Sequence, residues 1–156
     1  MNSTDTFRSK HKDYEWCDNR PAISLTQKRK KFSAKNNNNK YVCCYHSDTG
    51  DATEGQKVCD YILCVSESEE SSHERLYFIE LKGSDIDHAL KQIYETIIDS
   101  VVNFDLKPVQ IDARIVAAKV KAPNISTTHR AKLKTLLKRF GEGEIKLATN
   151  SMHEEI

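Results

Sequence analysis

Long apolar runs are missing from this chain of 156 residues. A helix that spans a bilayer needs about 20 consecutive apolar residues, so the sequence predicts no membrane partner. Residues 1–8 lack the apolar segment of a signal peptide, which favours a cytoplasmic location. The glycine-rich phosphate loop and the serine elbow of α/β-hydrolases are also absent. A hydrolase of some other phosphate-containing substrate is therefore the weaker hypothesis.

Cysteines are few, odd in number and poorly spaced for zinc. The chain has five of them and no C-x₂-C pair. Cys59 and Cys64 fall in a predicted buried strand, whereas the adjacent Cys43 and Cys44 must point to opposite faces of another strand. This pattern predicts small buried thiols, reduced in a cytosolic compartment, rather than a disulfide framework.

Charge is balanced overall but not along the chain. Residues 1–40 carry ten Lys/Arg against four Asp/Glu, 41–106 carry four against fourteen, and 107–156 carry ten against five. This layout fits an acidic metal site flanked by basic surfaces that bind a phosphate backbone. The alternative is a set of solvated faces on unrelated elements.

Hydrophobic periodicity predicts one α/β domain with a mixed central sheet and helices packed on its faces. The expected strands are 41–45, 58–65, 76–81, 111–120 and 144–149, and the expected helices are 84–103 and 126–140. Ser84 is the expected N-cap of the first helix, with Asp85 and Asp87 at the positive end of its dipole. Residues 41–150 form the expected core. Residues 1–40 are expected to be a basic segment that packs a helix on the core or stays loose, and 151–156 a frayed tail.

Two acids on neighbouring apolar strands are the most informative feature. Asp60 lies in the first strand, and Glu80 lies near the end of the second, followed by Lys82. Because side chains alternate along a strand, Glu80 and Lys82 share one face with Leu76 and Phe78. If the two strands pair antiparallel, Asp60 lies close to Glu80. A buried carboxylate is costly unless it is paired or binds a metal, and carboxylate-rich sites suit Mg²⁺ or Mn²⁺.

Asp60, followed by Glu80-Leu81-Lys82 at the end of an apolar strand, resembles the signature of the PD-(D/E)XK nuclease superfamily. Cys59 stands where the family name has proline. The order of elements after Lys82 (helix, strand, helix, strand) is also similar, so the resemblance covers about residues 41–150. It implies a restriction-endonuclease-like mixed central β-sheet flanked by α-helices, as in small nuclease-like proteins of bacteria and phages.

The resemblance also implies a mechanism. Asp60 and Glu80 would bind Mg²⁺ or Mn²⁺ together with the main-chain carbonyl of Leu81, and Lys82 would orient the attacking water. The expected activity is a metal-dependent DNA endonuclease in phage defence, restriction, repair or mobile-element biology. The alternatives are a structural Lys–Glu pair at a strand end, and an inactive nuclease-like module that binds nucleic acid or a partner protein.

Four further residues are weaker candidates for the site. An acid from the first helix often completes the family's site, so Glu15 qualifies if residues 8–18 are helical. Asp48 qualifies because it follows the first predicted strand. Gln92 and His88, one helical turn apart, would face the site from the helix after Lys82. The alternative for all four is an ordinary surface position.

Several basic residues are expected to contact phosphates without reading bases, with DNA favoured over RNA. They fall in an N-terminal run, a loop and the basic helix, at Lys28, Arg29, Lys30, Lys31, Lys119, Lys121, Arg130, Lys132 and Lys134. A one-site domain that cuts two strands would favour a homodimer, and a partner protein is the other option. Each basic cluster has the alternative of a merely solvated face.

Overall fold

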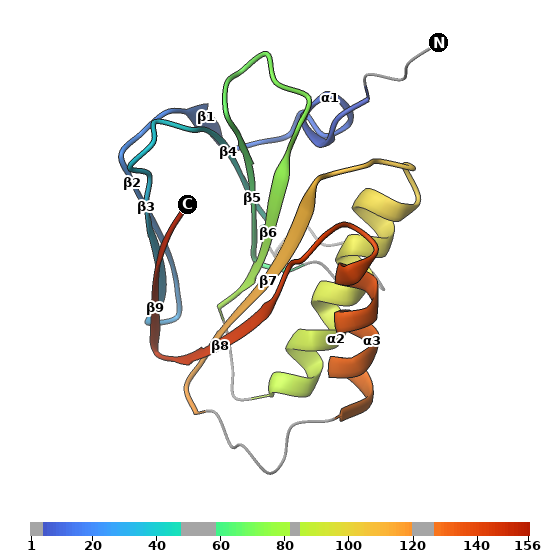
Figure 1. Cartoon of the computed structure of the whole chain (residues 1–156). Coiled ribbons are helices and arrows are strands. Elements are labelled where there is room, and N and C mark those ends of the chain that lie inside the picture. Colours follow the sequence, from blue (N-terminus) through green and yellow to red (C-terminus); the bar gives the residue numbers. More distant parts are fainter. Residues whose placement is uncertain (1–4, 48–58, 82–84, 120–126) are drawn as a thin grey trace.

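A computed structural model describes residues 5–47, 59–81, 85–119 and 127–156. Within these residues the chain is a mixed α/β structure of three layers (Figure 1). A six-stranded sheet forms the middle layer, two long helices cover one face, and a three-stranded sheet covers the other. In this part of the chain, no helix has the length and apolar character that crossing a membrane would require.

The large sheet is mixed, as predicted. Its strands, in spatial order, are β1 (Trp16–Asp18), β4 (Tyr41–His46), β5 (Tyr61–Ser66), β6 (Arg75–Glu80), β7 (Gln110–Ala117) and β8 (Ile145–Thr149). The first three pairings are antiparallel, and β6–β7 and β7–β8 are parallel. All six residues of β5 are buried, because layers cover this sheet on both faces.

The two long helices provide the crossovers between parallel strands. α2 (Ile86–Ile97) runs on into a π-helical turn, η2 (Ile98–Val102), and joins β6 to β7, while α3 (Thr127–Lys138) joins β7 to β8. The predicted apolar stripe of α2 is buried. Asp85 caps this helix, with its carboxylate accepting from the main-chain N–H of His88 at 3.0 Å. The predicted cap, Ser84, lies outside the described residues.

The three-stranded sheet corrects the prediction for residues 1–40. It consists of β2 (Ala22–Gln27), β3 (Lys30–Lys35) and β9 (Ser151–Glu155), and its inner face packs on the large sheet. The helix expected in this segment is a single turn, α1 (Phe7–Lys10). Ile23, Leu25 and Phe32 alternate with exposed or half-buried neighbours, so these strands bury one face only.

The C-terminal tail is not frayed, so that prediction is wrong. β9 pairs in parallel with β3, and Met152 and Ile156 are buried in the core between the sheets. Glu154 of the same strand forms an ion pair with the buried guanidinium of Arg114 on β7. Apolar contacts and a buried ion pair therefore hold the last strand, although the segment itself is polar.

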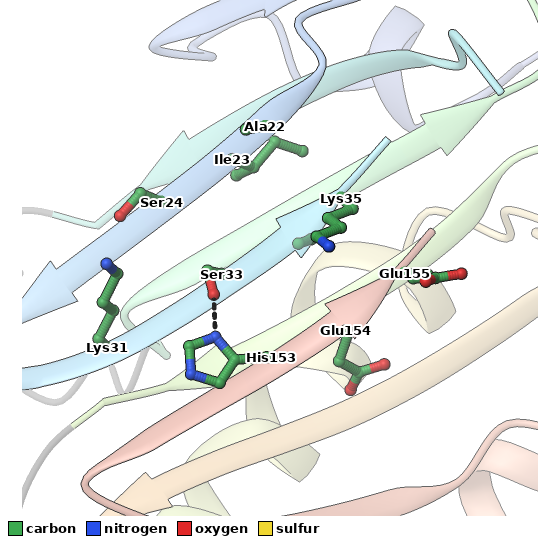
Figure 2. A pocket seen from close by; sticks show the side chains of 10 residues that line it. Ala22, Ile23, Ser24, Lys31, Ser33, Lys35, His153, Glu154 and Glu155 are labelled. Carbon is green, nitrogen blue, oxygen red and sulfur yellow. Dashed lines mark hydrogen bonds between the residues drawn. The ribbon is translucent and has the colours of Figure 1, made fainter. Parts of the chain in front are cut away.

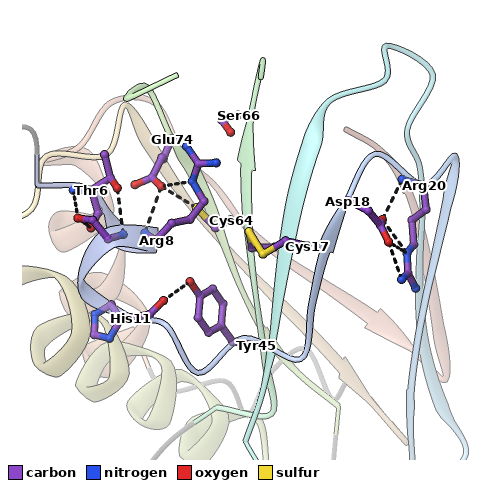
Figure 3. Close-up of a disulfide and its surroundings, with 12 residues drawn as sticks. Thr6, Arg8, His11, Cys17, Asp18, Arg20, Tyr45, Cys64, Ser66 and Glu74 are labelled. Atoms are coloured by element: carbon purple, nitrogen blue, oxygen red, sulfur yellow. Dashed lines mark hydrogen bonds and ion pairs between the residues drawn. A yellow bond between two sulfur atoms is a disulfide. The ribbon is translucent and has the colours of Figure 1, made fainter. Parts of the chain in front are cut away.

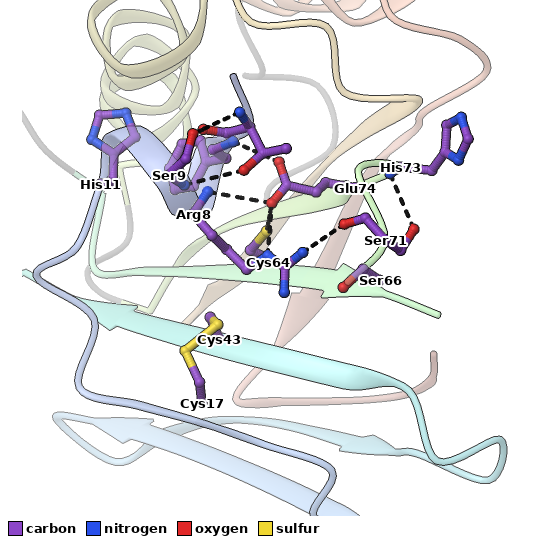
Figure 4. A network of polar contacts seen from close by, with 12 residues as sticks. Arg8, Ser9, His11, Cys17, Cys43, Cys64, Ser66, Ser71, His73 and Glu74 are labelled. Carbon is purple, nitrogen blue, oxygen red and sulfur yellow. Dashed lines mark hydrogen bonds and ion pairs between the residues drawn. A yellow bond between two sulfur atoms is a disulfide. The ribbon is translucent and has the colours of Figure 1, made fainter. Parts of the chain in front are cut away.

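A buried carboxylate just before the start of β6, that of Glu74, attaches α1 to the large sheet (Figure 4). Glu74, which is 2% exposed, accepts from the main-chain N–H groups of Phe7 and Arg8 and from the Arg8 guanidinium at 3.0 Å. The thiol of Cys64 donates to the same carboxylate at 3.1 Å. Burial first, and then Glu74, raises the pKa of Cys64 well above its ordinary value.

The reduced state expected of all five cysteines is wrong for two of them. Cys17 and Cys43 form a disulfide that links β1 to β4 (Figure 3). These residues lie opposite each other in the register of the two strands. The sequence did not predict β1, so it could not predict the pair. Cys43 and Cys44 do face opposite layers, as predicted, and Cys44, Cys59 and Cys64 are free and buried.

Candidate functional site

The antiparallel pairing of β5 and β6 brings the two predicted acids together. Tyr61 pairs with Ile79, so the next residues outward, Asp60 and Glu80, lie across from each other at the end of the ladder. Asp60 is 0% exposed and Glu80 is 1% exposed. By strand alternation both belong to the face that α2 covers, where Phe78 packs.

Reciprocal hydrogen bonds fix the two acids. The main-chain N–H of Asp60 donates to Glu80 Oε1 at 3.0 Å, and the main-chain N–H of Leu81 donates to Asp60 Oδ2 at 2.8 Å. Each carboxylate thus holds the backbone beside the other one. Leu81 is itself fully buried, so the backbone that leads from Glu80 to Lys82 is anchored in the core.

α2 is tied to the same strand end through Thr96. The hydroxyl of Thr96 accepts from the main-chain N–H of Cys59 at 3.0 Å and donates to the main-chain carbonyl of Gln92 at 2.7 Å. Thr96 was not among the sequence candidates. The only available signal was its place one turn after Gln92 on the buried stripe, which many core threonines share.

Gln92 is buried, with 6% of its surface exposed. Its side-chain Oε1 has no hydrogen-bond partner among the described residues. A buried amide oxygen of this kind is uncommon and suits a bound ligand or cation. His88, one turn earlier, is exposed. Of the two predicted helix residues, Gln92 is therefore the one that shares the buried face with Thr96.

Glu15 is not helical, since α1 ends at Lys10. It is exposed, and its carboxylate lies 3.3 Å from Nδ1 of His46 at the end of β4. The His46 ring stacks on Tyr61 with a centroid distance of 4.3 Å. Burial raises the pKa of Tyr61, and Cys44, Glu15 and Asp60 raise it further. Glu15 thus contacts His46, which with Tyr61 belongs to the face of the large sheet opposite to the acid pair, and strand register rather than a helix sets its position.

His46 and Tyr61 are neighbours of the site that sequence reasoning missed in this role. Their pairing in the β4–β5 register became visible only in the structure. The main-chain N–H of Ser47 also donates to the carbonyl of Asp60 at 2.9 Å. The ends of β4, β5 and β6 therefore meet at one edge of the sheet.

Three predicted residues lie outside the described part of the chain: Lys82, Asp48 and Lys121. Among the described residues, no group of three or more His, Cys, Asp or Glu side chains is arranged to hold a metal. Asp60 and Glu80 each supply a carboxylate, and Gln92 supplies an amide oxygen; both are hard oxygen donors of the kind that Mg²⁺ and Mn²⁺ prefer. The donor chemistry of this edge fits a hard divalent cation.

The predicted basic residues fall on two sides of the large sheet. Lys28 to Lys31 belong to the β2–β3 hairpin, on the side of the small sheet. Lys132 and Lys134 are exposed on α3, on the opposite side, with Arg130 half-buried near its start. Lys119 is exposed just after β7. A single nucleic-acid duplex lying flat on one face cannot contact both sets.

Comparisons with known proteins add no relative: no family model, curated protein or solved structure matches the chain.

Proposed function

We propose that this protein is a metal-dependent nuclease that hydrolyses phosphodiester bonds in DNA. The observation that carries the proposal is the buried pair of Asp60 and Glu80, joined by reciprocal hydrogen bonds to each other's backbone. In the sequence, Lys82 follows Glu80 by two residues. The order of elements supports a restriction-endonuclease-like fold. An antiparallel run of β4, β5 and β6 is followed by a helix, a parallel strand, a second helix and a further parallel strand.

Each residue of the pair has a defined part in this proposal. Asp60 and Glu80 would hold Mg²⁺ or Mn²⁺ through their carboxylates, with the Leu81 carbonyl as a further ligand. The ion, when bound, lowers the pKa of a water and offsets charge on the phosphate. Lys82 orients that water, and Gln92 contacts the nucleic acid. The fixed backbone between positions 60 and 81 keeps these groups in place before substrate arrives.

The biological setting that fits is phage defence, restriction or repair, in the cytoplasm, with a homodimer where both strands are cut. DNA is the proposed substrate rather than RNA. The Cys17–Cys43 disulfide weighs against a reducing compartment.

The test is cleavage of plasmid, linear, single-stranded and RNA substrates in Mg²⁺, Mn²⁺ and Ca²⁺. We expect cutting in Mg²⁺ or Mn²⁺ that Asp60→Asn, Glu80→Gln and Lys82→Ala each reduce at least about a hundredfold, as loss of a metal ligand or its support does. Asp105→Asn is the matched control, since it removes one carboxylate at a fully exposed position. Full activity in all three site variants would refute the assignment.

A catalytically inactive module that binds nucleic acid or a partner protein is the second candidate. The same reciprocal hydrogen bonds favour this candidate, because each carboxylate stabilises the backbone at or beside the other acid and so has a structural role without metal. The two candidates differ in metal binding. A nuclease must bind the cation, whereas a structural acid pair need not.

A further inference from the structure

The tip of the β2–β3 hairpin has an unusual backbone for its sequence. Gln27 pairs with Lys30, which leaves a two-residue loop of Lys28 and Arg29. Both loop residues have positive φ, 47° and 68°. Two-residue loops with positive φ at both positions normally contain asparagine and glycine, because a side chain is disfavoured in the left-handed region. Here the strained positions carry two long cations, and both are exposed. Such strain persists mainly where function requires it.

The outer face of the small sheet continues this basic tip (Figure 2). The register places small, hydroxyl and charged side chains on this face: Ala22, Ser24, Thr26, Lys31, Ser33, Lys35, Ser151, His153 and Glu155. A groove of about 690 Å³ crosses it. The Ser33 hydroxyl hydrogen-bonds to Nδ1 of His153 inside this groove, and Lys31 and Lys35 flank the pair. The two lysines, Ser33 and His153 are cations and hydrogen-bonding groups of the kind that contact phosphates and sugars, and the carboxylates of Glu154 and Glu155 also line the groove.

The hairpin is fixed to the start of β5, the strand that Asp60 precedes, on the face of the large sheet opposite to the acid pair. The hydroxyl of Tyr61, the residue after Asp60, donates to the main-chain carbonyl of Thr26 at 3.2 Å. Thr26 is two residues before the tip. In Figure 1 the tip of this hairpin lies at the same end of the molecule as the end of β6, where Glu80 lies. The tip therefore lies at the end of the large sheet that carries the acid pair, although the acid pair itself faces the helix layer that includes α3.

We infer that the β2–β3 hairpin and the adjoining groove bind the sugar–phosphate backbone of duplex DNA and position it at the acid pair. The inference rests on the proposed function for its substrate and adds the surface that holds it. Lys28, Arg29 and Lys31 contact phosphates, and Ser33 and His153 extend the contact along the sheet. A two-stranded hairpin also has the width that a major groove admits.

Duplex rather than single-stranded DNA follows from the chemistry of this face. Binding of single strands depends on aromatic side chains on which bases stack. The nine side chains of the outer face are aliphatic, hydroxylic or charged apart from His153, which Ser33 already holds. Cations and hydroxyls spaced along a rigid sheet instead suit the regular phosphates of a duplex.

The test uses Lys28→Asn together with Arg29→Gly in the full chain. This pair removes two cations but supplies the residues that the loop geometry prefers, so the fold should be kept or stabilised. Binding of a duplex DNA of about 20 base pairs is measured by fluorescence anisotropy in EDTA, so neither metal binding nor cleavage affects it. We expect affinity to fall about tenfold or more, and the slope of log K against log salt to fall by about 2, as for two lost phosphate contacts.

Two control variants complete the test. Lys12→Asn with Lys107→Asn removes the same charge at exposed positions away from the hairpin, and Lys132→Asn with Lys134→Asn removes it from α3. Both should bind duplex within about twofold of the parent, and the parent should bind a single strand of equal length more weakly. The inference would be overturned if the parent did not bind duplex DNA, or if the hairpin variant bound it with unchanged affinity. It would also be overturned by an equal loss of affinity in either control, or by equal affinity of the parent for the single strand or for duplex RNA. Binding is measured without metal, so DNA binding by the hairpin can be disproved while the nuclease assignment holds. In the same way, the nuclease assignment can be disproved while DNA binding by the hairpin holds.

Discussion

Two buried clusters of charged side chains lie on the large sheet, and they are built differently. In one, Asp112 and Glu154 are matched by the guanidinium groups of Arg75 and Arg114. In the other, the hydrogen bonds described for Asp60 and Glu80 come from main-chain N–H groups. The first cluster carries its own counter-charges from neighbouring strands. The second brings two carboxylates together at a sheet edge.

The difference indicates two uses of buried charge in one small protein. Arg114 joins β7 to the last strand and also donates to the carbonyl of Glu144 at 2.8 Å, so its cluster fixes the fold. The acid pair holds the backbone at Asp60 and Leu81, at the edge where the ends of β4, β5 and β6 meet. Stability should therefore depend on the first cluster, and function on the second.

The largest expected effect on stability comes from the matched cluster. Arg114→Met should destabilise the protein by about 3–5 kcal/mol, because it leaves Glu154 without its guanidinium partner and Asp112 with Arg75 alone. Urea unfolding measures the loss. Arg20→Met is a control, since Arg20 pairs with Asp18 where both side chains are 40% or more exposed. A loss below about 1 kcal/mol for Arg114→Met would show that this cluster does not fix the fold.

Metal should stabilise the protein through the acid pair alone. At a Mg²⁺ or Mn²⁺ concentration one hundred times the dissociation constant, we expect about 2.7 kcal/mol of added stability in the parent protein. Glu80→Gln should lose this response, and Glu154→Gln should retain it. Thermal unfolding with and without the cation makes the measurement. A response that survives Glu80→Gln would place the cation elsewhere.

Stability should also fall at alkaline pH, through the thiol beside the acid pair. Burial, and then Glu80 and Asp60, raises the pKa of Cys59 well above its ordinary value. Burial of the neutral Cys59 thiol contributes fully to the free energy of unfolding below pH 9, where the thiol of the unfolded chain is also neutral. This contribution is lost as the pH rises toward the pKa of the thiol in the folded protein. The expected loss is about 1.4 kcal/mol per pH unit for each such thiol. Cys44, whose pKa burial raises to about 12, adds to it.

Urea unfolding at pH 8 and pH 10 tests this dependence. Cys59→Ala should reduce the loss of unfolding free energy between pH 8 and pH 10. Cys44→Ala, which changes a thiol on the other face of the sheet, should reduce this loss by a comparable amount. Equal stability of the parent at both pH values would contradict the assigned burial of these thiols.

The smallest expected effect is that of neutralising one acid without metal. Glu80→Gln keeps the shape of the side chain and an oxygen that accepts from Asp60, so stability should change by less than about 1 kcal/mol. Glu154→Gln should cost more, because it weakens the pair with Arg114. Equal losses of unfolding free energy for Glu80→Gln and Glu154→Gln, measured in urea without metal, would show that the two clusters stabilise the fold equally.

The helices and central strands were predictable from the sequence because their signals are local. The buried stripe of α2 repeats at helical spacing, and β5 and β6 are apolar runs bounded by polar segments. The closeness of Asp60 and Glu80 followed from one assumption, the antiparallel pairing of these strands, which the structure confirms.

The small sheet was not predictable in the same way. β9 is polar except for Met152, and it is a strand because β3 lies beside it and Arg114 binds its Glu154. β1 has three residues and depends on β4. Long-range partners define both strands, so a local pattern could not reveal the disulfide, the hairpin or the chain from Glu15 through His46 to Tyr61.

Calorimetric titration of Mn²⁺ into the parent protein and into Asp60→Asn measures whether the acid pair binds the cation. We expect one site per chain in the parent and at least about a hundredfold weaker binding in the variant. Equal affinity in the two proteins, or no binding in the parent, would contradict it.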